Sequence, residues 1–335
     1  MAGETSPRTG GMAPAQLPTS AATAHVRADG RLSPTDRERL RRIPSWRNAL
    51  SVLSTYAQTL GIIVSAVRVD NPFVWVAAFL LMGRAHAQFA SLMHEAAHRL
   101  LFSHKGANDW VGMWLLGYPQ LTSTQAYRRV HMAHHRREFG PDEPDVPLYA
   151  NYPVSRASLR RKLVRDATGR TGWRLLGGQM RNLRSPDPRV RNTLVRMLCV
   201  QVLLAAVSFL LGHPFVYLLL WVLPYLTVWR VINRLRSIAE HGGMREDDDR
   251  RFTTHSVAQH PLAMFFMVPY KIGYHMAHHV DAGVPFRNLP EYHRLLHEAN
   301  YLDDRVEYPS YRALWHALAP ARNSTTPIVV IPPAP

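Results

Sequence analysis

Four long apolar stretches constrain the fold of this chain more than any other feature of its sequence. Each approaches the roughly 20 residues that a helix needs to cross a lipid bilayer, and together they cover about residues 49–68, 72–92, 194–212 and 214–232. They form two pairs, and the connection within each pair is only a few residues long. This arrangement favours membrane-spanning helices over buried helices of a soluble core. The sequence therefore predicts an all-α integral membrane fold with four transmembrane helices.

The basic residues predict how these helices are oriented. The chain carries a formal net charge of +16 and has a pI of about 10.6. Its arginines concentrate at 37–47, before the first apolar stretch, and at 156–191, between the second and the third. Because cytoplasmic loops of membrane proteins are rich in arginine and lysine, we expect both termini on the cytoplasmic side of a bacterial inner membrane. This placement accounts for the high pI without a nucleic-acid partner.

The remaining segments predict one structured domain with loose ends. Residues 1–34 are rich in Ala, Pro, Thr, Gly and Ser, a composition that predicts disorder. The tail at 301–335 is expected to be partly disordered, from about Arg322 onward. Two apolar segments, 109–118 and 261–270, are too short to span a bilayer and predict interfacial or re-entrant helices.

Eight histidines fall into three short clusters, one reading HEAAH and two reading HMAHH. Histidines four residues apart lie on one face of a helix and can bind one metal ion. In HxxHH the last two histidines diverge by about 100° on the helix, so they can reach two different ions. The spacing therefore predicts a two-metal site, on the same cytoplasmic side as the termini. Its ligands are His94, His98, His131, His134, His135, His275, His278 and His279.

The first cluster also has a different interpretation. HEAAH matches the H-E-x-x-H string of zinc metallopeptidases, in which the glutamate, here Glu95, acts as the general base. A membrane zinc peptidase is thus an alternative, but it explains only one cluster of the three. Imidazole binds several metals, so the ligand type alone does not select one. A two-metal, nitrogen-rich site at a membrane favours iron and the activation of dioxygen over hydrolysis.

The three clusters, in the order HxxxH, HxxHH and HxxHH and with four spans between them, resemble the membrane fatty acid desaturase and hydroxylase superfamily. The resemblance covers roughly residues 45–300 and includes the run GYHMAHHVDAGVPFRNLPEYHRLL. It implies a helical fold in which a cytosolic cap holds two Fe ions, with dioxygen as co-substrate. The segment NRLRSIAEH is similar to one that supplies a further ligand, which implies that His241 completes a set of nine.

The resemblance implies desaturation of a fatty acyl or lipid chain. Hydroxylases of carotenoids, alkanes or other hydrophobic substrates share these clusters, so the two reactions are not separated. Asp281 and Ala282 follow the third cluster where acyl-lipid members commonly have an apolar residue, a departure that bears on the substrate. With no fused haem string and a single cysteine, the chain is expected to need an external electron donor: a ferredoxin, a Rieske-type protein or a b-type cytochrome, with its reductase. The basic region 156–191 is a candidate docking surface.

Five further residues are candidates for a supporting role, in which a side chain holds a metal ligand by its other ring nitrogen. His86 lies two turns before His94 on the same predicted helix, and the carboxylates are plausible acceptors for ligand N–H groups. Each of the five could equally be a structural or surface residue. The candidates are His86, Glu95, Asp145, Glu240 and His293.

Overall fold

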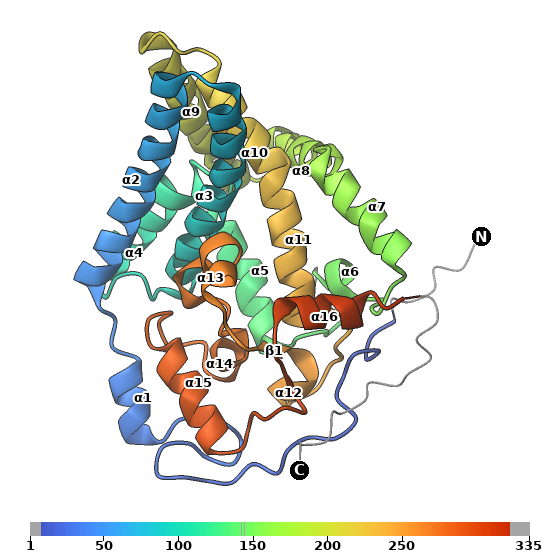
Figure 1. The fold of residues 1–335 in the computed structure, drawn as a ribbon. Helices are drawn as coiled ribbons and strands as arrows, with labels where there is room; N and C mark the ends of the chain where they lie inside the picture. The colour runs from blue at the N-terminus through green and yellow to red at the C-terminus, as the bar shows by residue number, and fades with distance from the viewer. Residues whose placement is uncertain (1–7, 142, 144, 322–335) are drawn as a thin grey trace.

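The computed structural model describes residues 8–141, 143 and 145–321, and the described chain is almost entirely helical. Four helical runs are long and apolar enough to cross a membrane, which confirms the predicted all-α class and its four spans. They stand together in the upper half of Figure 1. The runs are α2 (Ser45–Val69), α3 (Pro72–His98), α9 (Pro188–Leu210) and the run Tyr217–His241, made of η3 (Tyr217–Val222), α10 (Leu223–Leu226) and α11 (Val228–His241).

Shorter elements gather at one end of these runs and form a cap, most of it in the lower half of Figure 1. Two pairs of short helices overlap the segments 109–118 and 261–270, which were expected to be interfacial. They are α4 (Lys105–Trp110) with η1 (Val111–Gly117), and α13 (Pro261–Phe266) with η4 (Pro269–Lys271). The one sheet among the described residues is a parallel pair of two-residue strands. The helices are α1 (Pro34–Leu40), α4 (Lys105–Trp110), η1 (Val111–Gly117), α5 (Thr124–Arg136), α6 (Val146–Tyr149), α7 (Arg156–Ala167), α8 (Arg170–Met180), η2 (Arg181–Arg184), α12 (Arg250–Thr253), α13 (Pro261–Phe266), η4 (Pro269–Lys271), α14 (His275–Val280), α15 (Leu289–Glu298) and α16 (Tyr311–Leu318), and the strands are β1 (Ser256–Val257) and β2 (Glu307–Tyr308).

Helix α3 is the central element of the bundle. Asn71 caps its first turn by accepting a hydrogen bond from the Phe73 N–H, and Pro72 suits the first helical position. Half of its apolar window is buried, a larger share than in the other three runs. At Gly83 a Cβ would lie 2.2 Å from Val228 Cγ1, so only glycine permits the close approach of α3 to α11. This packing sets the middle of α3 against the start of α11, two helices whose last turns carry histidines.

The guanidinium of Arg84, inside α3, has hydrogen-bond acceptors at two of its three nitrogens. Arg84 donates to the Phe265 carbonyl at 2.9 Å, to Gln58 Oε1 at 2.7 Å and to Gln88 Oε1 at 2.9 Å. An arginine among apolar residues is costly unless its donors are satisfied in this way. The contact with Phe265 also fastens α13 against α3, which explains how the short helix lies on the bundle.

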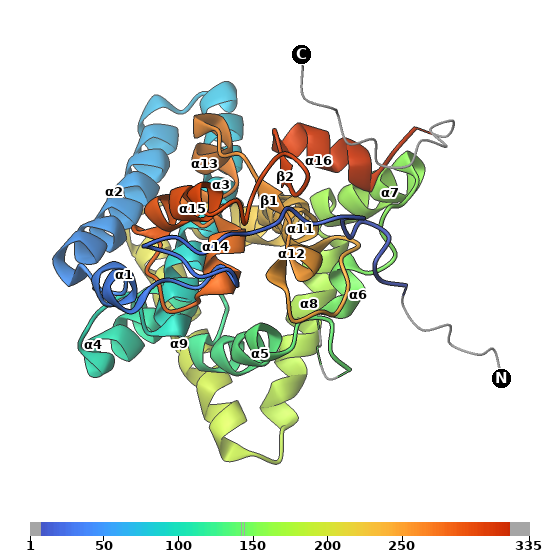
Figure 2. The ribbon, with the colours of Figure 1, turned by 90° about the horizontal axis from the view of Figure 1, so that it is seen from below.

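The N-terminal segment differs from the predicted disorder of residues 1–34. Residues 8–33 run along the underside of the cap (Figure 2). The Gly10 and Met12 N–H groups donate to the carbonyls of Met244 and Gly243, each at 2.8 Å, and Val26 is buried. A low content of apolar residues argues against an independent core. It does not prevent a segment from adding backbone hydrogen bonds and a few apolar anchors to an existing surface. Residues 1–7 lie outside the described part of the chain.

The C-terminal segment, residues 301–335, also has one part that the structure describes and one part that it does not. Residues 301–321 contain β2 and α16, whose Leu314 and Leu318 are fully buried against the cap. The disorder predicted from about Arg322 onward falls on residues 322–335, which lie outside the described residues. The tail predicted at 301–335 therefore begins with a structured part.

A buried ion pair joins α7 and α8 to α11. Asp166 has no exposed surface, and its carboxylate accepts hydrogen bonds from the Arg234 guanidinium and from the Thr171 hydroxyl. We expect Asp166→Asn to lower the free energy of unfolding by about 3 kcal/mol, because it leaves a buried guanidinium without its countercharge. Thermal unfolding of the detergent-solubilised full chain checks this. Arg160→Ala, at an exposed position of α7, is the matched control, and equal melting temperatures for the two variants would contradict the expectation.

Candidate metal centre

Four helices bring the nine predicted histidine ligands into one region of the cap. The last two turns of α3 carry the first cluster, and α5 and the single-turn α14 carry the second and the third. The ninth histidine is the last residue of α11. Seven of the nine are buried, whereas His98 and His135 are half-buried. The set is His94, His98, His131, His134, His135, His241, His275, His278 and His279.

The ligand nitrogens form two adjacent groups, in each of which they lie within 4.8 Å of one another. His275 Nε2 lies 3.0 Å from His241 Nε2 and 2.9 Å from His279 Nε2, which joins it to the second group. Both HMAHH clusters divide their last two histidines between the groups, as the 100° divergence predicts. The first group is His94, His98, His131, His135 and His278, and the second is His134, His241 and His279 with His275.

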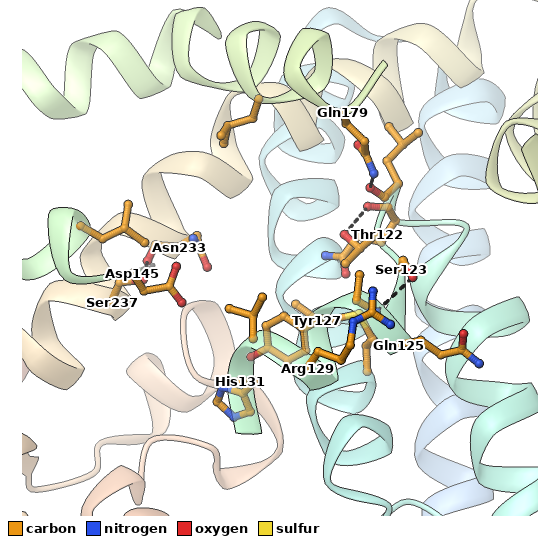
Figure 3. Close-up of a pocket in the computed structure, with 18 of the residues that line it drawn as sticks. Thr122, Ser123, Gln125, Tyr127, Arg129, His131, Asp145, Gln179, Asn233 and Ser237 are labelled. Carbon is orange, nitrogen blue, oxygen red and sulfur yellow. Dashed lines mark hydrogen bonds between the residues drawn. The ribbon is translucent and has the colours of Figure 1, made fainter. Parts of the chain in front are cut away.

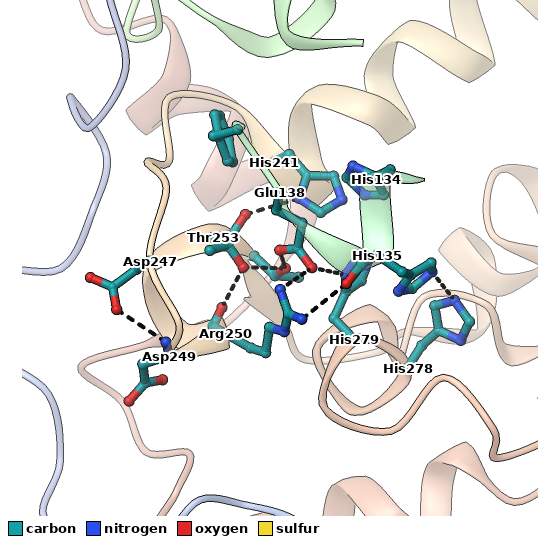
Figure 4. A network of polar contacts seen from close by, with 12 residues as sticks. His134, His135, Glu138, His241, Asp247, Asp249, Arg250, Thr253, His278 and His279 are labelled. Atoms are coloured by element: carbon teal, nitrogen blue, oxygen red, sulfur yellow. Dashed lines mark hydrogen bonds and ion pairs between the residues drawn. The ribbon is translucent and has the colours of Figure 1, made fainter. Parts of the chain in front are cut away.

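Acceptors outside the groups orient the rings. His279 Nδ1 lies 2.6 Å from Glu138 Oε1, and His241 Nδ1 lies 2.9 Å from the Thr253 carbonyl oxygen, as Figure 4 shows. His134 Nδ1 makes a short contact with the Glu143 carboxylate. A ring that donates from Nδ1 presents the lone pair of Nε2 on its other side. The outer acceptors therefore turn the Nε2 lone pairs inward, which is the arrangement found around protein-bound metals.

Spacing, burial and one unsatisfied atom indicate that these residues fit metal ions. His131 Nε2 lies 2.8 Å from His94 Nε2 and 3.1 Å from His135 Nε2, and His98 Nε2 is buried with no hydrogen-bond partner. Burial holds the pKa values of His131, His135 and His278 well below the ordinary histidine value. Such rings are neutral at pH 7, the form that binds metal. A neutral imidazole carries only one N–H, so closely spaced Nε2 atoms cannot all be satisfied by hydrogen bonds to one another. A cation in each group would accept their lone pairs.

Two of the five candidate supporting residues lie next to ligands. Glu240 lies 3.5 Å from His275 Nδ1 and pairs with Arg236 at 2.6 Å. Glu95 Oε1 lies 3.8 Å from His94 Nδ1, while its other oxygen accepts a hydrogen bond from the Phe286 N–H. Both carboxylates are thus close enough to influence a ligand ring, although neither distance is that of a strong hydrogen bond.

The other three candidates lie elsewhere. His86 Nε2 lies 3.0 Å from the Trp221 carbonyl oxygen, and its ring packs against Trp221 in the bundle core. His293 pairs with Glu307 at 3.0 Å and packs against Tyr274, outside the two groups. Asp145 lines a cavity beside the histidines, and burial raises the pKa of its carboxyl.

The residues that hold the ligands most directly were missed by the sequence analysis. They are Glu138, Glu143 and the Thr253 carbonyl. Glu138 carries the clearest signal in the sequence, because it is an acidic residue only three positions after His135, in the turn that follows the end of α5 at Arg136. Its carboxylate also converges with His135 and His279 closely enough to be a further ligand. Arg250 donates to it at 2.7 Å and fixes its orientation (Figure 4).

A cavity of about 1210 Å³ opens beside both histidine groups and reaches His131 and His241. Helices α5 and α11 line one side with polar side chains, among them Arg129, Asn233 and Ser237 (Figure 3). Helices α8 and α9 contribute the apolar side chains of Leu175, Leu176, Leu194 and Met197, together with the polar Gln179, Arg189 and Thr193. The cavity is therefore amphipathic, and it gives a small molecule or a chain a route to the histidines.

We expect Glu138→Gln to weaken metal binding by about 10- to 100-fold, because His279 loses the carboxylate that orients it. Competition with a chromophoric chelator, on detergent-purified full chain, measures this affinity. Glu246→Gln is the matched control, since Glu246 also pairs with an arginine at the end of α5 but lies half-exposed at the surface. Wild-type affinity in Glu138→Gln would show that the carboxylate does not act on the centre.

Comparison with known proteins agrees with this geometry. Residues 70–312 match the sequence profile of the family described as Fatty acid desaturase, a range that contains all nine histidines. Over 249 residues the chain is 26% identical to the dihydrorhizobitoxine desaturase of Bradyrhizobium elkanii, a match that covers 70% of this chain and 68% of that protein. Four helices that present nine histidines to one interior region, within a family match of this length, lead to one conclusion: the chain belongs to the fatty acid desaturase family and is an oxidoreductase.

Proposed function

We propose that this protein catalyses the oxygen-dependent desaturation of a substrate with an acyl or lipid-like chain, at two Fe ions held by the nine histidines. The observation that carries the proposal is the division of inward-facing Nε2 atoms into two adjacent groups. The mononuclear zinc site of an HEAAH peptidase would leave the second group unused. The desaturase relative supports dehydrogenation over hydroxylation, since its name describes that outcome.

Bound iron would supply the oxidising power, with dioxygen as co-substrate, to remove hydrogen from an unactivated C–H bond. The chain's own residues hold, orient and shield the reaction. Glu138 and Thr253 keep the ligand rings fixed from outside. Burial of seven of the nine histidines keeps bulk water from most of the centre.

The position of Glu95 argues against the zinc peptidase alternative. A general base must reach the water bound to the metal. Glu95 is fully buried and accepts a hydrogen bond from the Phe286 N–H, and it is not part of the converging groups among the described residues. A carboxylate held in this way lies beside the ring of His94 and is not placed to activate a metal-bound water.

The amphipathic cavity supports a substrate with both an apolar part and a polar part. Arg230 lines it and lies over the Tyr225 ring at 4.2 Å, and its Nε is buried without a hydrogen-bond partner. Among the described residues, no carboxylate lies within ion-pair distance of this guanidinium. An anionic group on the substrate would provide the missing partner. The apolar side chains of Leu175, Leu176, Leu194 and Met197 would then contact the apolar chain of the substrate.

The proposed setting is a bacterial inner membrane with the cap in the cytoplasm. The histidine groups lie at the end of the bundle near the arginine-rich segments, which supports this orientation. An external ferredoxin, Rieske-type protein or b-type cytochrome would deliver electrons. Exposed arginines of α7, α8 and η2 offer a basic docking surface for an acidic partner. They are Arg156, Arg160, Arg161, Arg165, Arg170, Arg174, Arg181 and Arg184.

Metal and product analysis test the proposed reaction. We expect two Fe ions per detergent-purified chain and, in an expressing host, an oxygen-dependent product that is two hydrogen atoms lighter than its precursor. Glu95→Gln should retain iron and form the same product, because Glu95 does not act as a base. A product that is one oxygen atom heavier than its precursor would show that the reaction is hydroxylation and not desaturation. One zinc ion and no iron would contradict the proposal altogether.

The cavity assignment is tested with Arg230→Gln. Loss of a charge-assisted hydrogen bond to substrate costs about 1.5–3 kcal/mol, so we expect KM for the identified substrate to rise by about tenfold or more, with iron content unchanged. Arg174→Gln, at an exposed position of α8 outside the cavity, is the matched control. If KM is unchanged in Arg230→Gln, the substrate does not bind through this guanidinium.

A further inference from the structure

A second set of converging ligand atoms lies outside the nine-histidine centre. His293 and His297 are one turn apart on α15, so their side chains lie on the same face of the helix. His293 Nε2 lies 3.0 Å from Glu307 Oε1, and His297 Nε2 lies 2.9 Å from Glu307 Oε2. One carboxylate thus faces two imidazoles, and the three groups offer ligand atoms within 4.8 Å of one another.

This spacing suits a tetrahedral ion. Zinc binds histidine nitrogen and carboxylate oxygen at about 2.0–2.2 Å, so ligand atoms around it lie about 3.3 Å apart. The two observed distances are within a few tenths of an ångström of that value, so little movement is needed. The side chains of His293 and Glu307 are 12% and 13% exposed, whereas that of His297 is 38% exposed. A fourth position therefore opens to solvent beside His297, where water can bind.

The carboxylate is positioned by the fold, independently of any ion. Strand β2 pairs in parallel with β1 so that Glu307 lies opposite Ser256, and the Ser256 hydroxyl donates to Glu307 Oε1 at 2.7 Å. Figure 2 shows α15 beside these two strands. The His293 ring packs on Tyr274 at 5.1 Å between centroids. Strand β1 and Tyr274, both of which precede α15 in the chain, therefore supply a rigid frame for Glu307 and His293. This frame limits the entropic cost of binding an ion.

The local charge favours a cation. Among the described residues no arginine or lysine pairs with Glu307, whose only ion-pair partners are the two histidines. Two neutral imidazoles and one carboxylate leave one net negative charge for a divalent ion to balance.

We infer that His293, His297 and Glu307 form a mononuclear binding site for a divalent cation of the zinc class, with water in the fourth position. The site is separate from the proposed iron centre and does not depend on the proposed function. A bound ion joins α15 to β2 and so fastens the C-terminal segment to the cap. Through the contact of His293 with Tyr274, it also steadies the residue that precedes His275. Its role in this position is to stabilise the frame around the third histidine cluster.

Zinc titration of the iron-replete, detergent-purified full chain tests the inference. We expect wild type to bind one equivalent of Zn²⁺ without losing iron, and His297→Gln and Glu307→Gln to lose that equivalent while keeping their iron. Zinc should also raise the melting temperature of wild type, and this rise should disappear in both variants. His316→Ala, which removes an exposed histidine of α16, is the matched control and should bind zinc as wild type does.

Two results would overturn the site. One is a wild-type chain that binds no zinc beyond what displaces its iron. The other is His297→Gln binding the same equivalent as wild type. His297 is the most exposed of the three ligands, so this variant has the least effect on folding, and its circular dichroism spectrum checks that it is intact. Iron content in the same samples reports separately on the proposed di-iron centre.

Discussion

The inward convergence of histidine Nε2 atoms is the constraint on which the rest of this structure depends. Neighbouring Nε2 atoms lie 2.8–3.1 Å apart, and a neutral imidazole has one N–H to donate. The rings of His241 and His279 direct Nδ1 to acceptors outside the groups. Their Nε2 lone pairs then face one another, an arrangement that is repulsive without a cation. Metal binding would resolve this conflict and would explain why the fold gathers nine imidazoles in a largely buried place.

Carboxylates that lie beside the histidine rings place negative charge around the two groups. Glu138 lies beside His279 and pairs with Arg250. Glu240 lies beside His275 and pairs with Arg236. Divalent ions held by neutral imidazoles carry uncompensated positive charge, which such carboxylates balance at short range. The two arginines hold these carboxylates in place beside the histidine rings. The histidine groups and this outer layer therefore form one polar unit inside an apolar bundle.

The sequence predicted the parts of this unit that depend on local periodicity. Four apolar stretches gave the four long helices, and the HxxHH spacing gave the division of His134 from His135 between the two groups. Contacts between distant segments were beyond it. Glu143 and the Thr253 carbonyl reach their histidines through loop geometry, which has no periodic signature. The ordered segment at residues 8–33 was missed for a related reason, since its backbone hydrogen bonds to Gly243 and Met244 leave no trace in composition.

Anomalous diffraction at the iron absorption edge, from crystals of the detergent-purified protein, tests the central claim most directly. The account predicts two iron peaks, one among His94, His98, His131, His135 and His278 and the other among His134, His241, His275 and His279. A single peak, or a peak that appears only at the zinc edge within these groups, would contradict a di-iron centre built by this chain.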